Sequence, residues 1–570
     1  MAGNLIRIKT EPLEERLLNA LNDSGKCPNY VRRMPPCKNA CPSSEDIRGY
    51  LTQIAQAELF GRSREESLDE AWHILTDKNP FPAVHGRVCP HPCENSCNRN
   101  ARDRPLSINN LERFIGDHGL RRGLRLRRLT DRRSEKKVAV IGAGPSGLSC
   151  AYQLARRGYP VTVYEDAGQA GGMLRTGIPH YRLPRDILDA EIENILDLGI
   201  ETRYGIRAGR DVPLEQLRQE YDAVYAAVGA QAGVRLAIEG EDLPGVYSGV
   251  DFLHRVNSGS LREAGGAVIV IGGGNAAIDA ARVAMRLGSA ATIVYRRSRM
   301  EMPAIPEEIR EAKRENVGFE FLAAPVRIRA GGPEPGGEAA GEGPHPLEVI
   351  FIRMELGEPD ESRRRRPVPV SGSEFIMRAD TVVAALGQRP DLEGIEGLAG
   401  EDGWGAVQAT RESAISGVFI GGDVIAQRFA TYAVGEGRMA ARAIAEYLRG
   451  RTYRQPYIPA PVRPGEIQLK YYDRIPRNDH GYLPLEERAR SFAEVNLPLP
   501  EEDAIAETRR CMSCGLCFVC DRCRIYCCQE AISKDLRRRP GRIMFTDYAK
   551  CVGCGTCAEV CPCHYIEMGY

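Results

Sequence analysis

The cysteines near the end of this chain constrain its fold more than any other feature of the sequence. Four of them have successive gaps of two, two and three residues and are followed by a proline: Cys551, Cys554, Cys557 and Cys561. A second run upstream has the same gaps: Cys517, Cys520, Cys523 and Cys527. Thiolates at this spacing surround a 4Fe–4S cluster, so the end of the chain is predicted to carry single electrons.

Two such runs in tandem predict one small ferredoxin-like module with two clusters, in which the fourth cysteine of each run ligates the cluster of the other run. The expected ligands of the first cluster are therefore Cys517, Cys520, Cys523 and Cys561. Those of the second are Cys551, Cys554, Cys557 and Cys527. Four cysteines have no place in this pattern: Cys511, Cys514, Cys528 and Cys563. The first two are spaced well enough to be alternative ligands, but only the chosen set ends in a three-residue gap.

Composition narrows the class of function. The formal net charge is zero, so nothing in the overall balance suggests binding to nucleic acid. No apolar run is long enough to span a bilayer, and the first residues lack the apolar core of a signal peptide. We therefore expect a cytoplasmic protein, where 19 cysteines indicate metal sites rather than disulfides.

The sequence divides into zones by pattern. Residues 1–133 are rich in helical pattern and hold a first group of cysteines: Cys27, Cys37, Cys41, Cys89, Cys93 and Cys97. Between 134 and 450, β-rich runs alternate with helical runs, which is typical of βαβ units and an α/β fold. A Pro-rich connector at 451–508 leads to the cysteine-rich module at 509–570.

The segment that begins KVAVIGAGPSGL at Lys137 predicts a strand that runs into a dinucleotide-binding loop. Gly142, Gly144 and Gly147 form GxGxxG, a helical pattern follows, and the next strand ends at Glu165. The glycines permit a tight turn and close approach of the pyrophosphate to the helix N-terminus, while the acid binds ribose hydroxyls. The surrounding strand, helix and acid make chance a poor explanation of the motif.

A second motif of this kind follows, with Gly272, Gly274 and Ala277 forming GxGxxA after a strand. Its next strand ends in Arg296 and Arg297 instead of an acid. An arginine at this place suits a 2′-phosphate and favours NADPH. Alternatively, the two arginines contact the pyrophosphate or the adenine, or nothing.

Two dinucleotide folds in one chain suggest one site for a flavin and one for a nicotinamide. A further strand ends in Gly422 and Asp423, and an aspartate there could hold the ribityl or phosphate region of a flavin. Because these residues are far from the first motif, we expect a flavin domain split into 134–250 and 378–450. The nicotinamide domain, 251–377, would be inserted between the two parts, and the turn at 384–390 fits the return crossing.

These motifs resemble the flavoprotein superfamily that contains glutathione and thioredoxin reductases. The central zone has only Cys150, so the disulfide chemistry of those enzymes is not expected. Residues 37–450 more closely resemble the glutamate synthase small-subunit family, through PPCKNACP, NPFPAVHGRVCPHPCENSC, GGMLRTGIPHYRLP and VYRRSRMEMPA. This resemblance implies N-terminal 4Fe–4S clusters, FAD with Gly172 among its contacts, and NAD(P)H. It also implies hydride transfer from nicotinamide to FAD, for which no catalytic side chain is expected.

The same resemblance implies ligands in the N-terminal domain. One cluster would be held by Cys41, Cys89 and Cys93 together with Glu112, although without the resemblance Glu112 would be taken for a solvated helix residue. Cys37 and Cys97 match ligands of another cluster. The early Cys-x-x-Cys usual in the family is missing here and only Cys27 is left, so one or two N-terminal clusters are expected.

The tail, with CMSCGLCFVCDRCRIYCCQEAI, most resembles that of the NAD(P)H:acceptor oxidoreductase of the dissimilatory sulfite reductase system. This implies a sulfite reductase as redox partner. Two alternatives share every upstream motif: a flavoprotein subunit of glutamate synthase or of a 2-oxoacid:ferredoxin oxidoreductase. An alternative of another class is a redox-silent assembly scaffold, which intact dinucleotide motifs argue against. A homodimer is compatible with the sequence.

Overall fold

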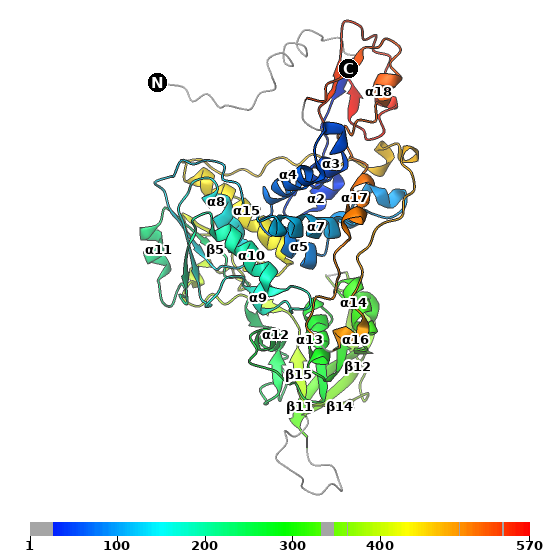
Figure 1. Ribbon diagram of the computed structural model, residues 1–570. Helices are drawn as coiled ribbons and strands as arrows, with labels where there is room; N and C mark the ends of the chain where they lie inside the picture. The colour runs from blue at the N-terminus through cyan, green and yellow to red at the C-terminus, as the bar shows by residue number, and fades with distance from the viewer. Residues whose placement is uncertain (1–26, 332–346, 362, 490, 538–540, 570) are drawn as a thin grey trace.

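The computed structural model describes residues 27–331, 347–361, 363–489, 491–537 and 541–569. The first residues, on which the expectation of a missing signal peptide depends, lie outside these ranges. A helical domain occupies the centre of the molecule, flanked by two parallel sheets and by the C-terminal module (Figure 1). The expected α/β architecture, with a helical N-terminal domain and two dinucleotide-binding folds, is confirmed.

The central domain is built from helices: α2 (Pro36–Ala40), α3 (Ile47–Ala55), α4 (Arg64–Thr76), α5 (Pro82–Val88), α6 (Pro92–Asn95) and α7 (Ile108–Arg121). A proline starts α2, α5 and α6, where its missing N–H leaves no helical hydrogen bond unmade. Glycine lets α5 and α7 cross closely, because a Cβ on Gly86 would lie 2.3 Å from the Cα of Arg113. This tight crossing fixes the relative places of Cys89, just after α5, and Glu112 on α7.

The first sheet is parallel, in the order β17-β5-β2-β3-β4. Its strands are β2 (Val138–Ile141), β3 (Val161–Glu165), β4 (Glu201–Tyr204), β5 (Ala223–Ala226) and β17 (Val418–Ile420). Its helices are α8 (Pro145–Ala155), α9 (Met173–Thr176), α10 (Arg185–Leu196), α11 (Leu214–Glu220) and α15 (Ala430–Tyr447). Pairing of β17 with β5 brings the GGD segment into the sheet that holds the first glycine motif, so this domain is split by an insertion.

The second sheet is also parallel, in the order β10-β9-β8-β15-β7. Its strands are β7 (Val246–Ser248), β8 (Ala267–Ile271), β9 (Ala290–Tyr295), β10 (Gly318–Phe321) and β15 (Thr381–Ala384). Its helices are α12 (Gly249–Asn257), α13 (Asn275–Arg286) and α14 (Pro306–Arg314). Because β7 and β15 both pair within this sheet, the inserted domain extends beyond 251–377 on either side. Which sheet β7 and β15 join depends on their pairing partners, which the local sequence pattern does not reveal.

An antiparallel sheet packs on the second domain: β11 (Ala323–Ala330), β12 (Leu347–Pro359), β13 (Arg365–Pro369) and β14 (Phe375–Ala379). A short ribbon, β6 (Ala232–Gly233) with β16 (Gln388–Arg389), joins the outgoing and returning crossings between the two domains. The return crossing therefore falls within the turn that the sequence indicated.

The C-terminal module lies at one end of the molecule, against the helical domain (Figure 1). It contains α18 (Arg522–Ile525), β18 (Ile532–Lys534), β19 (Met544–Thr546), α19 (Thr556–Glu559) and β20 (Ile566–Met568). The strand β1 (Pro28–Tyr30) pairs antiparallel with β20, so the first described residues belong to this module. The connector has little regular structure apart from α16 (Leu485–Arg488) and α17 (Glu501–Arg509).

A buried charged network holds the second parallel-sheet domain against the first. Arg182, from the loop after α9, pairs with Asp279 on α13 at 2.7 Å. Tyr181 donates its hydroxyl to the same carboxylate at 3.2 Å, and the Arg286 guanidinium lies 3.9 Å from the Tyr181 ring centroid. The connector joins this contact, because the Val495 amide donates to the Tyr181 carbonyl at 3.0 Å. The two domains are thus locked in one relative orientation.

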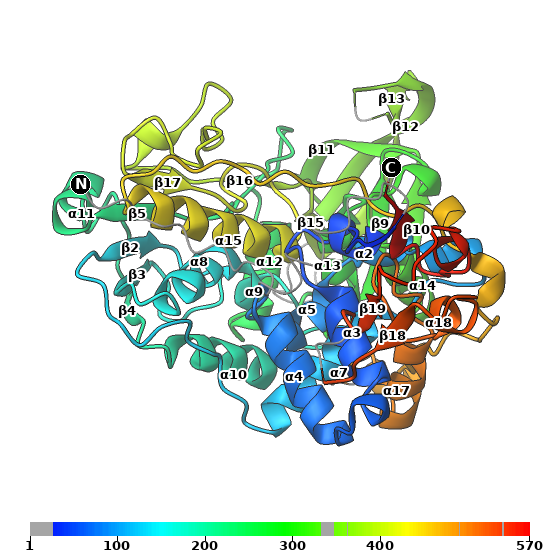
Figure 2. The same cartoon turned by 90° about the horizontal axis from the view of Figure 1, so that it is seen from above.

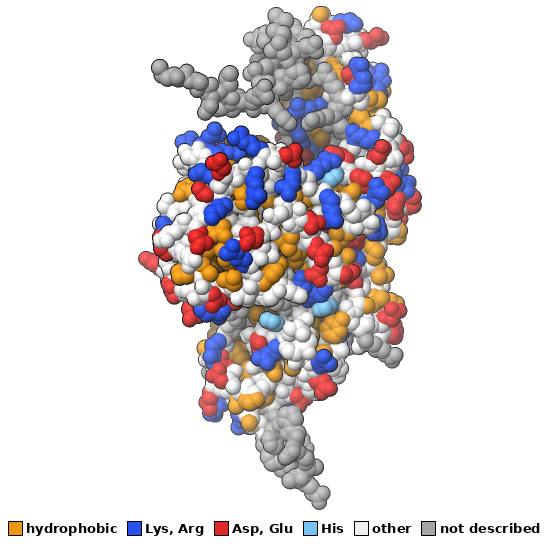
Figure 3. All heavy atoms as spheres, turned by 60° about the vertical axis from the view of Figure 1, so that its left-hand side comes forward, with side chains coloured by type: hydrophobic (Ala, Val, Ile, Leu, Met, Phe, Trp, Pro, Cys, Tyr) orange, Lys and Arg blue, Asp and Glu red, His pale blue; other side chains and the backbone are white. Residues whose placement is uncertain are grey.

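The described helices include none that is both long and apolar enough to cross a membrane. On the face that carries the first parallel-sheet domain, basic, acidic and apolar side chains are interspersed (Figure 3).

Replacing Asp279 with Ala should lower the free energy of unfolding by about 3 kcal/mol, because the buried Arg182 guanidinium loses the nearer of its two carboxylate partners and keeps only Glu308, at 3.5 Å. Urea titration followed by circular dichroism measures the change. Asp251→Ala is the matched control, since it removes an exposed i,i+4 pair with Arg255 and should cost about 0.5 kcal/mol. Equal effects of the two substitutions would mean that the network does not lock the domains.

Candidate functional site

The first glycine loop leaves no room for side chains between β2 and α8. Gly142 has a φ of 99°, and a Cβ there would lie 2.4 Å from the Ala227 carbonyl oxygen. A Cβ on Gly147 would lie 1.9 Å from the Gly142 carbonyl oxygen. Glu165, at the end of β3, accepts from the Ala143 amide at 2.6 Å and so fixes the loop. The start of α8 is left open to a phosphate, which is the arrangement of a dinucleotide site.

Two distant segments complete this cradle. A Cβ on Gly172 would lie 2.9 Å from the Cα of Gly144, and one on Gly422 would lie 2.7 Å from the Ser146 side chain. Both segments therefore meet the N-terminus of α8. Burial raises the pKa of Asp423 to about 6, and the one backbone amide that reaches this carboxyl, from Arg428, is 3.4 Å away. A partly desolvated acid with spare acceptor capacity fits the hydroxyls of an FAD ribityl chain.

The second glycine loop is similarly built. A Cβ on Gly272 would lie 2.3 Å from the Ala385 carbonyl oxygen, whereas a Cβ on Gly274 would meet no atom within 4 Å. The open space at Gly274 lies at the N-terminus of α13, where a pyrophosphate would bind. Ala277 is fully buried in the same helix and allows it to pack against the sheet.

The two arginines that follow β9, Arg296 and Arg297, have different surroundings. Arg297 is buried, donates Nε to the Arg365 carbonyl at 2.8 Å and forms an ion pair with Asp360. Its guanidinium is occupied by contacts to the antiparallel sheet and the loop after β12, which favours the alternative that Arg297 contacts no nucleotide. Arg296 is exposed at the end of β9 and is free to approach a 2′-phosphate. The partner of Arg297 lies 63 residues away, which the local sequence could not reveal.

In the helical domain, Cys93 is buried, Cys41 and Cys89 are partly buried, and the three thiols are close enough to interact electrostatically. Glu112 interacts with two of these thiols, is only 5% exposed and accepts from the Asn79 amide nitrogen at 2.9 Å. The alternative of a solvated helix residue is therefore wrong. Buried thiols with raised pKa values are stable as thiolates only when a metal binds them, and this set fits a 4Fe–4S cluster.

The sequence interpretation missed two neighbours of this site. Glu45 and His85 lie with Glu112 so that one ligand atom from each is within 4.8 Å of the others, and all three are buried. Burial raises the pKa of Glu45 to about 8 and lowers that of His85 to about 3. Burial and the nearby Glu45 carboxyl raise the pKa of Glu112 well above its usual range. Either carboxyl could therefore complete the thiol set; the only sequence signal for Glu45 is its place shortly after Cys41.

A second thiol set joins the two ends of the chain. The thiol of the partly buried Cys37 interacts electrostatically with those of Cys97, Cys511 and Cys514. Cys511 and Cys514, which the sequence pattern left as surplus to the tail or as alternative ligands there, thus lie beside the helical domain. Their Cys-x-x-Cys spacing indicated metal ligands, but it could not show that they lie beside Cys37 and Cys97.

The C-terminal module has two cavities lined by cysteines. One is lined by Cys517, Cys520, Cys523, Cys561 and Cys563, and the other by Cys527, Cys528, Cys551, Cys554 and Cys557. Each holds one of the expected four-cysteine sets plus one of the unassigned residues. The Cys563 sulfur is 3.8 Å from that of Cys561, and Cys27 lies beside Cys551. Both cavities have the thiols that a 4Fe–4S cluster requires.

The flavin cradle and the first thiol set meet at the start of α15. This helix packs along α8 and touches α5 (Figure 2). The Ser43 hydroxyl donates to the Thr431 carbonyl at 3.2 Å, and the Thr431 side chain lies near the Cys89 thiol. A Cβ on Gly435 would lie 2.5 Å from the Pro42 carbonyl oxygen, so the contact is very close.

Comparison with known proteins accounts for this arrangement. Residues 136–439 match the family described as pyridine nucleotide-disulphide oxidoreductase. The chain belongs to this family. Residues 9–124 match dihydropyrimidine dehydrogenase domain II, 4Fe-4S cluster, and residues 544–564 match a 4Fe-4S binding domain.

Three similar proteins span most of the chain. The beta subunit of NADP(+)-dependent formate dehydrogenase from Moorella thermoacetica is 39% identical over 84% of this chain and 70% of its own length. The beta subunit of NADPH-Fe(3+) oxidoreductase from Geobacter sulfurreducens is 37% identical, over 84% and 75%. The small chain of NADPH glutamate synthase from Escherichia coli is 34% identical, over 73% and 89%. This protein is therefore an oxidoreductase that uses FAD, NAD(P) and 4Fe–4S clusters.

Proposed function

We propose that this protein passes electrons between NADP(H) and a partner redox enzyme that docks near the C-terminal module. The observation that carries the proposal is the spatial order of the sites. The flavin cradle contacts the Cys41 set through α15, the Cys37 set lies in the same helical domain, and the two cysteine-lined cavities follow in the module. The sites thus form one series from the sheet domains to the far end of the molecule (Figure 1).

The residues of the chain have distinct tasks in this proposal. The Gly272 loop binds the nicotinamide dinucleotide, and the Gly142 loop with Asp423 binds the flavin dinucleotide. Tyr181 and Arg182 hold the two domains in a fixed orientation, so both dinucleotides bind to a preformed frame. When bound, the cofactors supply hydride acceptance at FAD and one-electron transfer at the clusters. This division requires no side-chain acid, base or nucleophile.

Replacing Cys554 with Ala should remove the cluster nearest the end of the module while leaving the flavin site unchanged. We expect the low-temperature EPR signal of NADPH-reduced clusters to lose the contribution of one cluster, with bleaching of flavin absorbance by NADPH unaltered. Val552→Ala is the matched control, because Val552 lines the same cavity, is 61% exposed and offers no ligand. Loss of flavin bleaching in the Cys554 variant would show that the two parts are not separable.

Replacing Arg296 with Ala should weaken NADPH more than NADH, because the exposed guanidinium is placed to meet a 2′-phosphate. We expect kcat/KM for flavin reduction by NADPH to fall about tenfold or more, and that for NADH to change less than about twofold. Stopped-flow measurement of flavin bleaching gives both values. Arg299→Ala is the control, since Arg299 is also exposed on this segment. Equal losses with both nucleotides would contradict the assignment.

For the partner we propose a dissimilatory sulfite reductase, on the resemblance of the tail and its ten cysteines lining two cavities. Anoxic capture of the tagged protein from its host should recover a sirohaem enzyme, and kinetics should then be measured in both directions. Recovery of a formate dehydrogenase, a glutamate synthase or a 2-oxoacid oxidoreductase subunit would overturn the choice of partner and leave the electron-transfer function standing.

A further inference from the structure

Four partly buried cysteines meet where two segments far apart in the sequence touch. Cys37 and Cys97 come from the helical domain, and Cys511 and Cys514 come from the segment that follows α17. Each of the last two interacts electrostatically with Cys97, and Cys37 interacts with all three. None is in a disulfide. The Asn98 amide nitrogen lies 3.5 Å from the Cys514 sulfur and 2.9 Å from the Val462 carbonyl oxygen, which ties both segments together.

We propose that Cys37, Cys97, Cys511 and Cys514 bind a further 4Fe–4S cluster, shared between the helical domain and the C-terminal segment. This site takes the place of the early Cys-x-x-Cys that the sequence lacks. The proposal concerns the electron route of the protein and holds whichever partner enzyme accepts the electrons.

The charges around the four thiols favour an anionic ligand. Arg48 is 2% exposed, and its Nη1 donates to the carbonyl oxygens of Arg33 and Cys514. Asp46 interacts electrostatically with Arg48 but forms its ion pair with Arg32, at 2.8 Å. No carboxylate of the described residues lies within 4.0 Å of the Arg48 guanidinium, and its Nε has no hydrogen-bond partner there. Burying a cation is costly unless it is paired and hydrogen-bonded. A 4Fe–4S cluster with four thiolate ligands carries net negative charge and would add an anion close to Arg48.

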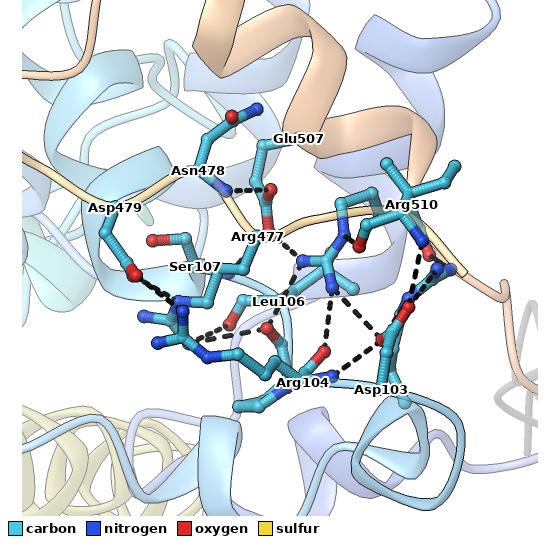
Figure 4. A network of polar contacts seen from close by, with 12 residues as sticks. Asp103, Arg104, Leu106, Ser107, Arg477, Asn478, Asp479, Glu507 and Arg510 are labelled. Atoms are coloured by element: carbon cyan, nitrogen blue, oxygen red, sulfur yellow. Dashed lines mark hydrogen bonds and ion pairs between the residues drawn. The ribbon is translucent and has the colours of Figure 1, made fainter.

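A second set of buried charges fixes the position of Cys511. Arg510 is 0% exposed and donates to Glu507 at 2.5 Å, to Asp103 at 3.1 Å and to the Arg104 carbonyl at 2.9 Å (Figure 4). Glu507 in turn accepts from the Ser107 amide at 2.9 Å. Arg99, two residues after Cys97, donates to the Arg510 carbonyl at 2.6 Å. The two cysteine segments are therefore held together by contacts that do not involve the thiols themselves.

The place of this site in the chain suits a relay. Cys37 is the second residue of α2 and Cys41 follows its last residue. The Cys41 amide donates to the Cys37 carbonyl at 3.1 Å, so this site shares a helix with the Cys41 set. On the other side, Cys514 is three residues before Cys517, which lines the first cavity of the module. Three residues span at most about 11 Å between Cα atoms. The shared site therefore lies between the Cys41 set of the helical domain and the first cavity of the module.

Cys511→Ser and Cys514→Ser test the proposal in the full-length protein purified without oxygen. Each should lower iron and acid-labile sulfide by about one quarter, which is four atoms of a total of about sixteen. The flavin-to-protein ratio and NADPH bleaching of the flavin should stay within error of wild type. Cys150→Ala is the matched control, since Cys150 is buried in α8 away from the thiol sets and should leave iron unchanged.

Unchanged iron in both serine variants would overturn the proposal, as would stoichiometric zinc, because four cysteines also suit a structural zinc ion. If the variants do not fold, the wild-type protein decides the question. About sixteen iron atoms per flavin are expected with the shared cluster and about twelve without it. Iron loss with intact NADPH bleaching separates failure at this site from failure of the proposed nicotinamide and flavin function.

Discussion

The burial of Arg510 is the constraint on which the arrangement of the iron–sulfur sites depends. A guanidinium that is 0% exposed must have its donors satisfied, and Asp103 and Glu507 with nearby carbonyls meet that requirement (Figure 4). This contact holds a segment from the end of the chain against the loop before α7. The pairing of β1 with β20 makes a second tie between the two ends. The C-terminal module is therefore anchored to the helical domain, although more than three hundred residues of sheet domains separate them in sequence.

The second meeting point lies at the start of α15, where a helix of the flavin domain touches Pro42 and Cys89. Together the two anchors put the sites in a spatial order that differs from their order along the chain. From its first described residues the chain runs from the module through the helical domain and both sheet domains, and it returns along the connector to the module. The connector also fixes the domains in place, since Arg488 pairs with Glu311 of the second sheet domain at 2.7 Å. The segment that its proline content marked only as a connector thus makes specific contacts with the domains that it passes.

Much of the fold could be predicted because its signals are local. The strand, glycine loop and helix around Gly142 and Gly272 follow from short-range sterics, since a Cβ at either place would meet a backbone oxygen. What could not be predicted depends on contacts distant in sequence. Arg297 is occupied by Asp360, Glu45 reaches the Cys41 set, and Cys511 meets Cys37. The strands β7 and β15 fall in the second sheet for the same reason, because a strand does not encode its partner.

The meeting of cysteines from distant parts of the sequence affects how the domains fold. The regions that match separate 4Fe-4S domain families, residues 9–124 and 544–564, are not independent units here, because β1 pairs with β20 and Cys37 lies beside Cys511. Metal binding at thiols from two segments is coupled to bringing those segments together. The burial of Arg48 with no carboxylate of the described residues within 4.0 Å points the same way, since a cluster would add negative charge close to that guanidinium. Assembly of the electron route and docking of the module are therefore one event, and the series of sites is complete only in the fully folded chain.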